Sequence, residues 1–179
     1  MPATITASRI DHPRIYVACL AAYNNGILHG AWIDAAREPW AIYDEVKTVL
    51  AASPVAEGDE WAIHDYECFG GARIEEYTSF ETVSALAMFI AEHGALGGAL
   101  LAHFSGDIDE AREAIEDRYH GCHASLADYV RELTEEATPI PPSLRYYIDY
   151  QAMARDAEMS GDLFTIETAW NEVHVFAGC

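Results

Sequence analysis

One stretch of the chain, residues 60–80, combines residue types that could carry acid–base chemistry. It reads EWAIHDYECFGGARIEEYTSF and places His64 beside Asp65, with Glu67 two residues further on. Adjacent side chains on a strand point to opposite faces, so His64 and Asp65 cannot form a dyad there. Asp65 and Glu67 share a face about 7 Å apart, a separation at which two carboxylates could do acid–base work. A solvated strand face explains the same pattern, because nothing in the sequence marks a pocket around the pair.

A second candidate group is formed by His120, Cys122 and His123, whose side chains are typical zinc ligands. A structural zinc site needs four ligands, and no second cluster at a suitable spacing supplies the rest. The nucleotide-binding patterns GxGxxG and GxxxxGK[ST] are absent, as is the nucleophile motif GxSxG. We therefore expect no metal, no cofactor and no catalytic residue, with a small hydrolase using Asp65 and Glu67 as the enzymatic alternative.

The excess of carboxylates is the more distinctive chemical feature. The chain of 179 residues carries 30 acidic and 10 basic residues, a formal net charge of -20, and Lys47 is its only lysine. Direct binding of nucleic acid or of an anionic membrane surface needs clustered cations and is not expected. The net charge is -1 over residues 1–56, -15 over residues 57–136 and -4 over residues 137–179. The acidity is therefore concentrated in the middle of the chain.

Hydrophobic patterning predicts an α+β fold in which these acids are held on helices and strands. Two strand-like runs, 14–23 and 27–34, flank Asn24-Asn25-Gly26, a sequence suited to a tight hairpin. The further elements that we expect are a helix over 38–53, a strand over 61–67, a helix over 80–91, an apolar stretch over 99–104 after a glycine-rich interruption, helices over 107–117, 125–137 and 143–161, and a hairpin from 163–170 and 172–176. The predicted domains are an N-terminal sheet with a helix (1–76), a central helical piece (77–116) and a C-terminal α+β domain with a terminal hairpin (117–179).

Two of the predicted helices are amphipathic, with acids along the polar face. The helix over 107–117 carries five acids from Asp109 to Asp117, and the helix over 125–137 carries four from Asp128 to Glu136. Eight residues of helix rise about 12 Å, so the acids recur about every 3 Å along the axis. One DNA strand carries a phosphate about every 3.4 Å. The spacing is therefore compatible with imitation of a phosphate backbone, although ordinary solvated helix faces can also be acidic.

The N-terminal segment has no basic start followed by an apolar run, and no apolar run is long enough to span a bilayer. The four cysteines are scattered, with no CxxC pair. Together these features predict a cytoplasmic protein with reduced thiols.

Four stretches of the chain resemble the ArdA-type antirestriction proteins: IYVACLAAYNNGILHGAWID, EWAIHDYE, EEYTSF and PPSLRYYIDYQAMARDAEMSG. The resemblance runs from about Arg14 to about Phe176. It implies an elongated homodimer of three-part chains that resembles bent B-form DNA and involves no catalytic residue. The implied partner is a type I restriction–modification enzyme, whose methyltransferase and specificity subunits form the DNA-binding groove that such a protein occupies.

Charge and resemblance together predict an acidic DNA-mimic surface. Its candidate residues are Asp65, Glu67, Glu75, Glu76, Asp109, Glu110, Glu113, Glu116, Asp117, Asp128, Glu132, Glu135 and Glu136. The resemblance places the dimer contact in the C-terminal part, where Tyr146, Tyr147 and Tyr150 are candidates, with packing inside the monomer as the alternative. The alternative function is that of an acidic inhibitor of a different DNA-binding protein.

Overall fold

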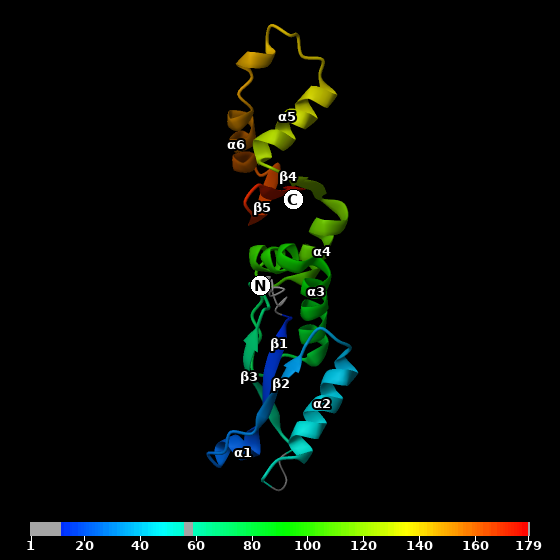
Figure 1. Ribbon diagram of the computed structural model, residues 1–179, viewed down its shortest axis with the longest axis vertical. Helices are drawn as coiled ribbons and strands as arrows, with labels where there is room; N and C mark the ends of the chain where they lie inside the picture. The colour runs from blue at the N-terminus through cyan, green and yellow to red at the C-terminus, as the bar shows by residue number, and fades with distance from the viewer. Residues whose placement is uncertain (1–11, 56–58, 179) are drawn as a thin grey trace, which may run out of the picture. The chain divides into compact units, whose positions relative to one another are not determined.

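The chain folds into two compact units, each built on its own three-stranded antiparallel sheet (Figure 1). The computed structural model describes residues 12–55 and 59–178. The units comprise Met1–Ile108 and Asp109–Cys179. The mixture of helices and antiparallel sheets confirms the predicted α+β class, whereas the division into three domains stays a prediction. The expectation about a leader sequence concerns a segment that lies almost entirely outside the described residues.

Unit 1 places two helices against one face of its sheet. Its elements are β1 (Arg14–Cys19), α1 (Leu20–Asn24), β2 (Gly30–Asp34), α2 (Pro39–Ala51), β3 (Trp61–Glu67) and α3 (Phe80–His103). The strand order is β2-β1-β3, with Ile15 opposite Ile33 on one side and Tyr66 on the other. Phe80 of α3 stacks on Trp61 at 4.3 Å between ring centroids and meets Tyr43 of α2 edge-on. These rings join the sheet to both helices.

The connection between β1 and β2 differs from the predicted tight hairpin, because α1 interrupts it. Gly26 has φ of +75°, as predicted for Asn-Gly, but it ends a helix instead of forming a two-residue turn. The Gly26 amide donates to the Tyr23 carbonyl and the Ile27 amide to the Ala22 carbonyl, which is the Schellman arrangement of a helix C-terminus. The Asn25 side chain reinforces it by donating to the Ala21 carbonyl.

Helix α3 is kinked at Gly94, where φ is 58° and ψ is -135°. The glycine-rich interruption was predicted, but it is confined to this residue, and the helix continues through Gly97 and Gly98. By length and composition α3 could cross a membrane, so the expectation that no apolar run is long enough to span a bilayer was wrong. Ten of its residues are buried in unit 1, so α3 also contributes to the core of that unit.

The loop after β3 approaches α3 so closely that two positions need glycine. A Cβ on Gly70 would lie 2.5 Å from the Gly98 carbonyl oxygen, and one on Gly71 would lie 2.3 Å from the Ala102 Cα. Gly70 also has φ of +60°, which favours glycine sterically. Loop and helix therefore meet backbone to backbone.

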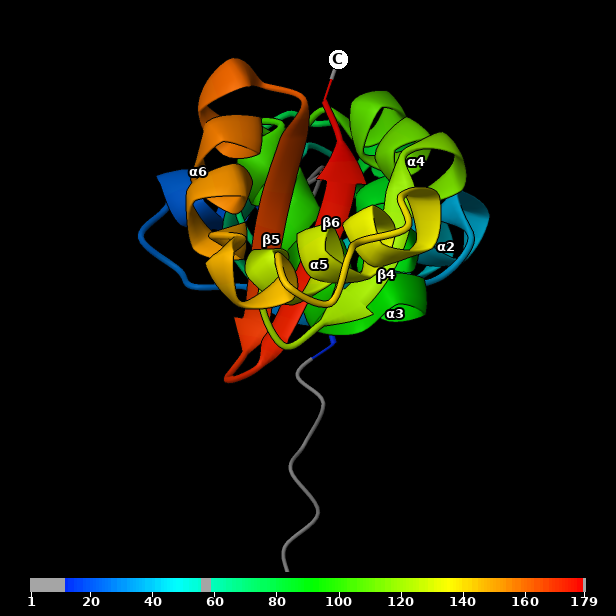
Figure 2. The same ribbon diagram turned by 90° about the horizontal axis from the view of Figure 1, so that it is seen from above.

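Unit 2 places α5 and α6 against one face of its sheet. Its elements are α4 (Ile108–Asp117), which begins at the unit boundary, β4 (Tyr119–His123), α5 (Leu126–Ala137), the 3-10 helix η1 (Arg145–Tyr147), α6 (Tyr150–Ser160), β5 (Leu163–Ala169) and β6 (Glu172–Ala177). The strand order is β4-β6-β5. The core joins Leu126 and Val130 of α5, Ala154 of α6 and Val175 of β6. Figure 2 shows β5 and β6 as the predicted terminal hairpin.

Two elements of unit 2 differ from the sequence prediction. Strand β4 was not predicted, because its sequence YHGCH lacks apolar alternation and its pairing with β6 contains an irregularity at Gly121. The helix predicted over 143–161 begins only at Tyr150, where the Asp149 carboxylate caps it by accepting from the Ala152 amide at 2.9 Å. Its predicted end at Gly161 is confirmed, with φ of +80°.

The opposite face of the unit 2 sheet is aromatic. The Phe164 and Phe176 rings stack at 4.9 Å, and the Tyr119 ring lies 5.0 Å from that of Phe176. The Tyr119 hydroxyl lies 2.7 Å from His174 Nδ1, and the Thr168 hydroxyl lies 3.1 Å from Nε2. Burial lowers the pKa of His174, although the nearby Glu172 carboxylate opposes this shift. Burial also raises the pKa of the Tyr119 phenol.

Gly71→Ala should destabilise unit 1, because its methyl group would overlap the α3 backbone at Ala102. We expect a loss of about 1–3 kcal/mol in the free energy of unfolding. Gly98→Ala is the matched control: its Cβ would lie 3.5 Å from the Gly70 Cα, an ordinary contact, and the higher helix propensity of alanine favours a gain of up to about 1 kcal/mol. Denaturant titration followed by tryptophan fluorescence measures both. Equal stability of the two variants would contradict the close packing.

The lowered pKa of His174 predicts a pH dependence of unit 2 stability. In the unfolded chain His174 takes up a proton more readily, so the stability that depends on its neutral form is present above the ordinary histidine pKa of about 6.5 and is lost as the pH falls below it. Between about pH 8 and pH 5, the wild-type chain should lose more stability than His174→Gln. Parallel stability curves for the two proteins would refute this assignment.

Candidate acidic interaction surface

The acidic residues lie at the surface of both units. None of the aspartates and glutamates in the described ranges, 12–55 and 59–178, is buried. Of the 13 acids predicted for the surface, all are exposed except Asp128, which is partly exposed. Four belong to unit 1, on β3 and the loop that follows it, and nine belong to unit 2, on α4 and α5.

In unit 1, the outer face of the sheet carries Asp65 and Glu67. The register places both on one face, as predicted, opposite Tyr16 and Arg14 of β1. Arg14 binds Glu67 at 2.6 Å, and its guanidinium lies 4.8 Å from the centre of the Trp32 ring. Asp65 is held differently: its carboxylate accepts from the Tyr66 amide at 2.8 Å. The carboxylates of Asp65 and Glu67 therefore have different partners, and both lie on a solvated face of the sheet.

His64 does not join Asp65 and Glu67 in a catalytic group, as expected from its place on the strand. The strand pairing passes from Tyr16–Asp65 to Val17–Ile63, which leaves His64 as the extra residue of a bulge. Its ring packs edge-on against Tyr23 at 4.7 Å. The position of His64 therefore does not support the alternative of a hydrolase that uses Asp65 and Glu67.

The loop after β3 adds Glu75 and Glu76 to the same edge of unit 1. Arg73 binds Glu75 at 2.9 Å, with both side chains largely exposed. The Glu76 carbonyl accepts from the Ile63 amide at 2.9 Å, which fastens the loop to β3. The backbone positions of these two acids are thus defined, while the Glu76 carboxylate faces solvent.

In unit 2, α4 presents its acids around a buried cation. Ala111 and Ala114 are buried, so the acids Asp109, Glu110, Glu113, Glu116 and Asp117 fall on the exposed faces. Arg118, whose side chain is only 9% exposed, binds Glu110 at 3.0 Å and reaches Glu113 at 3.8 Å. A partly buried arginine packs through its aliphatic stem as well as through its charge. Arg118 therefore holds two of the five carboxylates of α4, those of Glu110 and Glu113.

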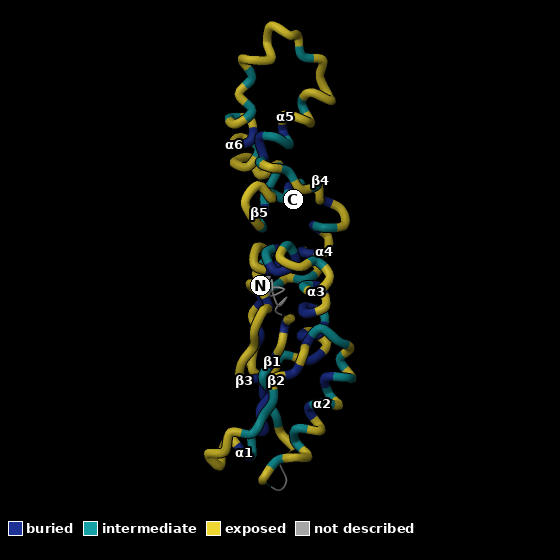
Figure 3. The backbone as a smooth tube through the Cα atoms, viewed as in Figure 1, coloured by how far each residue is buried: buried dark blue, intermediate teal, exposed yellow. Residues whose placement is uncertain are grey.

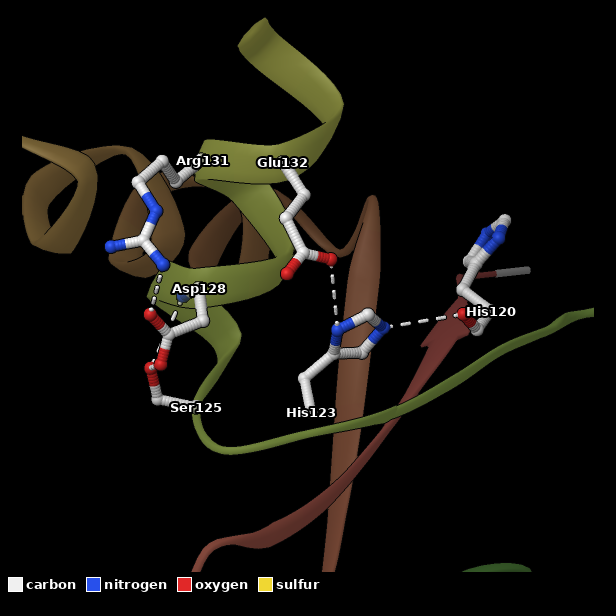
Figure 4. A network of polar contacts seen from close by, with 6 residues as sticks. All are labelled: His120, His123, Ser125, Asp128, Arg131 and Glu132. Carbon is white, nitrogen blue, oxygen red and sulfur yellow. Dashed lines mark hydrogen bonds and ion pairs between the residues drawn. The ribbon is translucent and has the colours of Figure 1, made fainter. Parts of the chain in front are cut away.

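Helix α5 is capped and charged as predicted (Figure 4). The Ser125 hydroxyl accepts from the Asp128 amide at 3.1 Å and donates to the Asp128 carboxylate at 2.7 Å. Arg131, one turn further on, binds Asp128 at 2.8 Å. The exposed face beyond carries Glu132, Glu135 and Glu136.

His123 ties α5 to β4 (Figure 4). Its Nδ1 lies 3.4 Å from the Glu132 carboxylate, and its Nε2 lies 3.3 Å from the His120 carbonyl. Both ring nitrogens thus face an acceptor, and which of them donates depends on the tautomer. The rings of His120 and His123 also pack against Tyr129. These histidines therefore support the acidic helix, and the described residues contain no group of three or more His, Cys, Asp or Glu side chains that could hold a metal ion.

The three candidate tyrosines occupy two different environments. Tyr146 and Tyr147 lie on η1 and are 94% and 84% exposed, and Figure 3 shows the whole connection between α5 and α6 as largely exposed. Tyr150 instead packs against the core of unit 2 and donates to Glu135 at 3.4 Å. Partial burial raises the pKa of the Tyr150 phenol, and the Glu135 carboxylate adds to the rise.

Most of the basic side chains that the structure describes form ion pairs with carboxylates of the same chain. Of the nine basic residues in the described ranges, six form ion pairs, namely Arg14, Arg37, Lys47, Arg73, Arg118 and Arg131. Sequence reasoning missed this role, although the spacing of Asp128 and Arg131 (i, i+3 on a helix) signals one such pair. The surface that remains is rich in carboxylates whose natural complement is a cationic partner.

The family model described as "Antirestriction protein (ArdA)" matches residues 15–172, nearly the whole chain. No curated protein matches the chain.

Arg118→Ala should destabilise unit 2, because it removes a buried stem and releases Glu110 and Glu113. Both carboxylates are about half exposed, so water takes over part of the lost interaction, and we expect about 1–3 kcal/mol. Arg112→Ala removes an exposed arginine from the same helix and should cost less than about 0.5 kcal/mol. Hydrogen exchange of the unit 2 amides measures the difference, and equal protection in both variants would contradict the anchoring role.

Proposed function

Because the chain belongs to the ArdA family of antirestriction proteins, we propose that it occupies the DNA-binding groove of a type I restriction–modification enzyme as an acidic mimic of DNA. The family consists of inhibitors of restriction rather than enzymes. In this proposal the target is the core formed by the methyltransferase and specificity subunits. Restriction is blocked because cognate DNA and the inhibitor compete for the same cationic groove.

The proposal rests on one observation: the acidic side chains are exposed, whereas most of the basic side chains are paired. The acids in the described ranges are at the surface, while six of the nine basic residues in the same ranges form ion pairs with the chain's own carboxylates. Surplus carboxylates such as Glu116, Asp117 and Glu136 remain exposed on α4 and α5. A DNA-binding groove presents cations that are normally paired with phosphates, and an exposed single-sign surface complements them.

Helical geometry supports the comparison with a phosphate backbone. Acids at positions i, i+4 and i+8 of α4, namely Asp109, Glu113 and Asp117, recur about every 6 Å along the axis. This is about two phosphate steps of one DNA strand. The carboxylates sit on preformed helices, so the inhibitor bears no deformation energy of the kind that bending a duplex requires.

We further propose that the chain acts as a homodimer in the cytoplasm. The exposed pair Tyr146 and Tyr147, with the half-exposed Leu144 beside them, forms an aromatic and apolar surface of the type that is enriched in protein interfaces. Tyr150 supports this surface from within the monomer through its contact with Glu135.

The test is displacement of labelled cognate duplex from a purified type I methyltransferase core at several salt concentrations. Displacement at near-stoichiometric protein that weakens steeply with salt is the expected result, because the interaction consists of many charge contacts. A failure to displace DNA at any salt concentration would exclude this target and favour a different DNA-binding protein as the partner.

A pair of charge variants separates a specific surface from bulk charge. The surface variant neutralises five exposed acids of the candidate set: Asp65→Asn, Glu76→Gln, Glu116→Gln, Asp117→Asn and Glu136→Gln. The control neutralises five exposed acids elsewhere: Glu38→Gln, Asp59→Asn, Glu60→Gln, Asp156→Asn and Glu167→Gln. All ten side chains are exposed, and both variants change the net charge equally.

At about 0.5 kcal/mol per exposed charge contact, the surface variant should lose about 2.5 kcal/mol of binding free energy, between tenfold and hundredfold in affinity. Each of its five single substitutions should cost only about twofold. The control variant should stay close to wild type. An equal loss in both variants would reduce the mechanism to bulk charge, and one indispensable acid would refute distributed recognition.

A further inference from the structure

Unit 1 contains a pocket whose lining includes none of the 13 candidate acids. It has a volume of about 780 Å³ and is lined by residues between His12 and Ala102, all within unit 1. Pockets that bind small molecules commonly have volumes of about 300–1,000 Å³ and mostly apolar walls with a few polar groups. The pocket beside α3 meets both criteria, since Ile90, alanines and glycines make up most of its lining.

The kink of α3 produces the hollow. Gly94 turns the chain with φ of 58° and ψ of -135°, so the wall contains Ile90 and Ala91 from before the kink and Ala95 and Ala99 from after it. These alanines carry only a methyl group, which leaves space where larger side chains would fill the angle of the helix.

The loop after β3 forms another part of the wall. Gly70 and Gly71 line the pocket, held against α3 by the close backbone contacts with Gly98 and Ala102. Cys68, at the start of this loop, also lines the pocket and has φ of 64°. A non-glycine residue in this region is strained and persists where its surroundings fix it, as at ligand sites. The loop and α3 thus form the wall of the pocket together.

The charge at the pocket selects the ligand. Among the described residues that line the pocket, Glu92 is the only carboxylate, and the lining also includes His12 and His93. The Glu92 side chain is 75% exposed, with the carboxylate 4.0 Å from His93 Nε2. The net charge of -20 disfavours anions throughout the surrounding field. A suitable ligand would place an apolar body against the apolar walls at the kink of α3. It would direct one basic group toward the Glu92 carboxylate.

We propose that this pocket is a binding site for a small apolar organic cation, with the two segments of α3 and the Gly70–Gly71 loop enclosing its apolar body. The site lies outside the predicted acidic surface and does not depend on inhibition of a restriction enzyme. Its occupant bridges the helix on both sides of Gly94 and contacts the thiol-bearing loop.

The full-length protein contains its own reporter for this site. Cys68 lines the pocket and is exposed, and Cys122 is exposed in unit 2. The probes are 2-naphthylmethylamine and 2-naphthoate, which share one apolar body but carry opposite charges. The measurement is the rate of alkylation of each thiol by iodoacetamide, determined by mass spectrometry. At an amine concentration that fills about nine-tenths of the pockets, alkylation of Cys68 should slow about tenfold while that of Cys122 changes less than twofold.

Two substitutions and one control substitution test whether the protection of Cys68 comes from this pocket. Ala95→Leu places a larger side chain in the pocket and should abolish protection of Cys68, whereas Ala137→Leu on α5 should leave it intact; both alanines are exposed. Glu92→Gln should remove the preference for the amine over 2-naphthoate. Equal protection of Cys68 and Cys122, protection that survives Ala95→Leu, or no protection by the amine would each overturn the proposal. Displacement of DNA from the methyltransferase core is measured separately, so either proposal can fail alone.

Discussion

Mutual repulsion among exposed carboxylates is the constraint under which the whole chain folds. A net charge of -20 on 179 residues opposes compaction, and each unit has only a three-stranded sheet and a few helices to offset it. The few cations are accordingly placed where they stabilise most. Arg118 lies buried beneath α4, and Arg131 closes the first turn of α5. Both arginines pair with acids of the candidate surface, so the same ion pairs stabilise the fold and position these carboxylates.

The apolar cores likewise depend on a small number of closely packed contacts. In unit 1, Phe80 brings together rings from β3 and α2, and two glycines let a loop touch α3 backbone to backbone. In unit 2, the small core around Val130 and Val175 covers one face of the sheet, while aromatic rings pack on the other. Close packing at these few points compensates for the limited size of each core.

Sequence patterns predicted the parts of the fold that depend on local signals. Pro39 and Ser125 start their helices where expected, and Gly161 ends α6. The failures came from competing local chemistry and from tertiary pairing. Asn25 and Gly26 serve as a helix end in place of a hairpin turn. Strand β4 exists through its partner β6, which a sequence without apolar alternation does not reveal.

The sequence could predict which acids belong to the candidate surface, but not which partners hold their carboxylates in place. Composition and helical spacing indicate which carboxylates face solvent. They do not indicate that Glu67, Glu110 and Asp128 are engaged by arginines, because two of these arginines come from outside the helix or strand that carries the acid. The bond from Tyr150 to Glu135 likewise depends on how α5 and α6 meet. The ion pairs and hydrogen bonds between different helices and strands therefore became visible only in the structure.

The separation between anchoring cations and surplus acids has an evolutionary consequence. Exposed acids such as Glu116 and Glu136 can be exchanged or moved by single mutations at little cost to folding. If recognition is spread over many such acids, the inhibitor can drift to follow changing targets, while a host enzyme that replaces one groove cation escapes very little. The few positions that cannot drift freely, among them Arg118 and Gly71, are those that hold the scaffold.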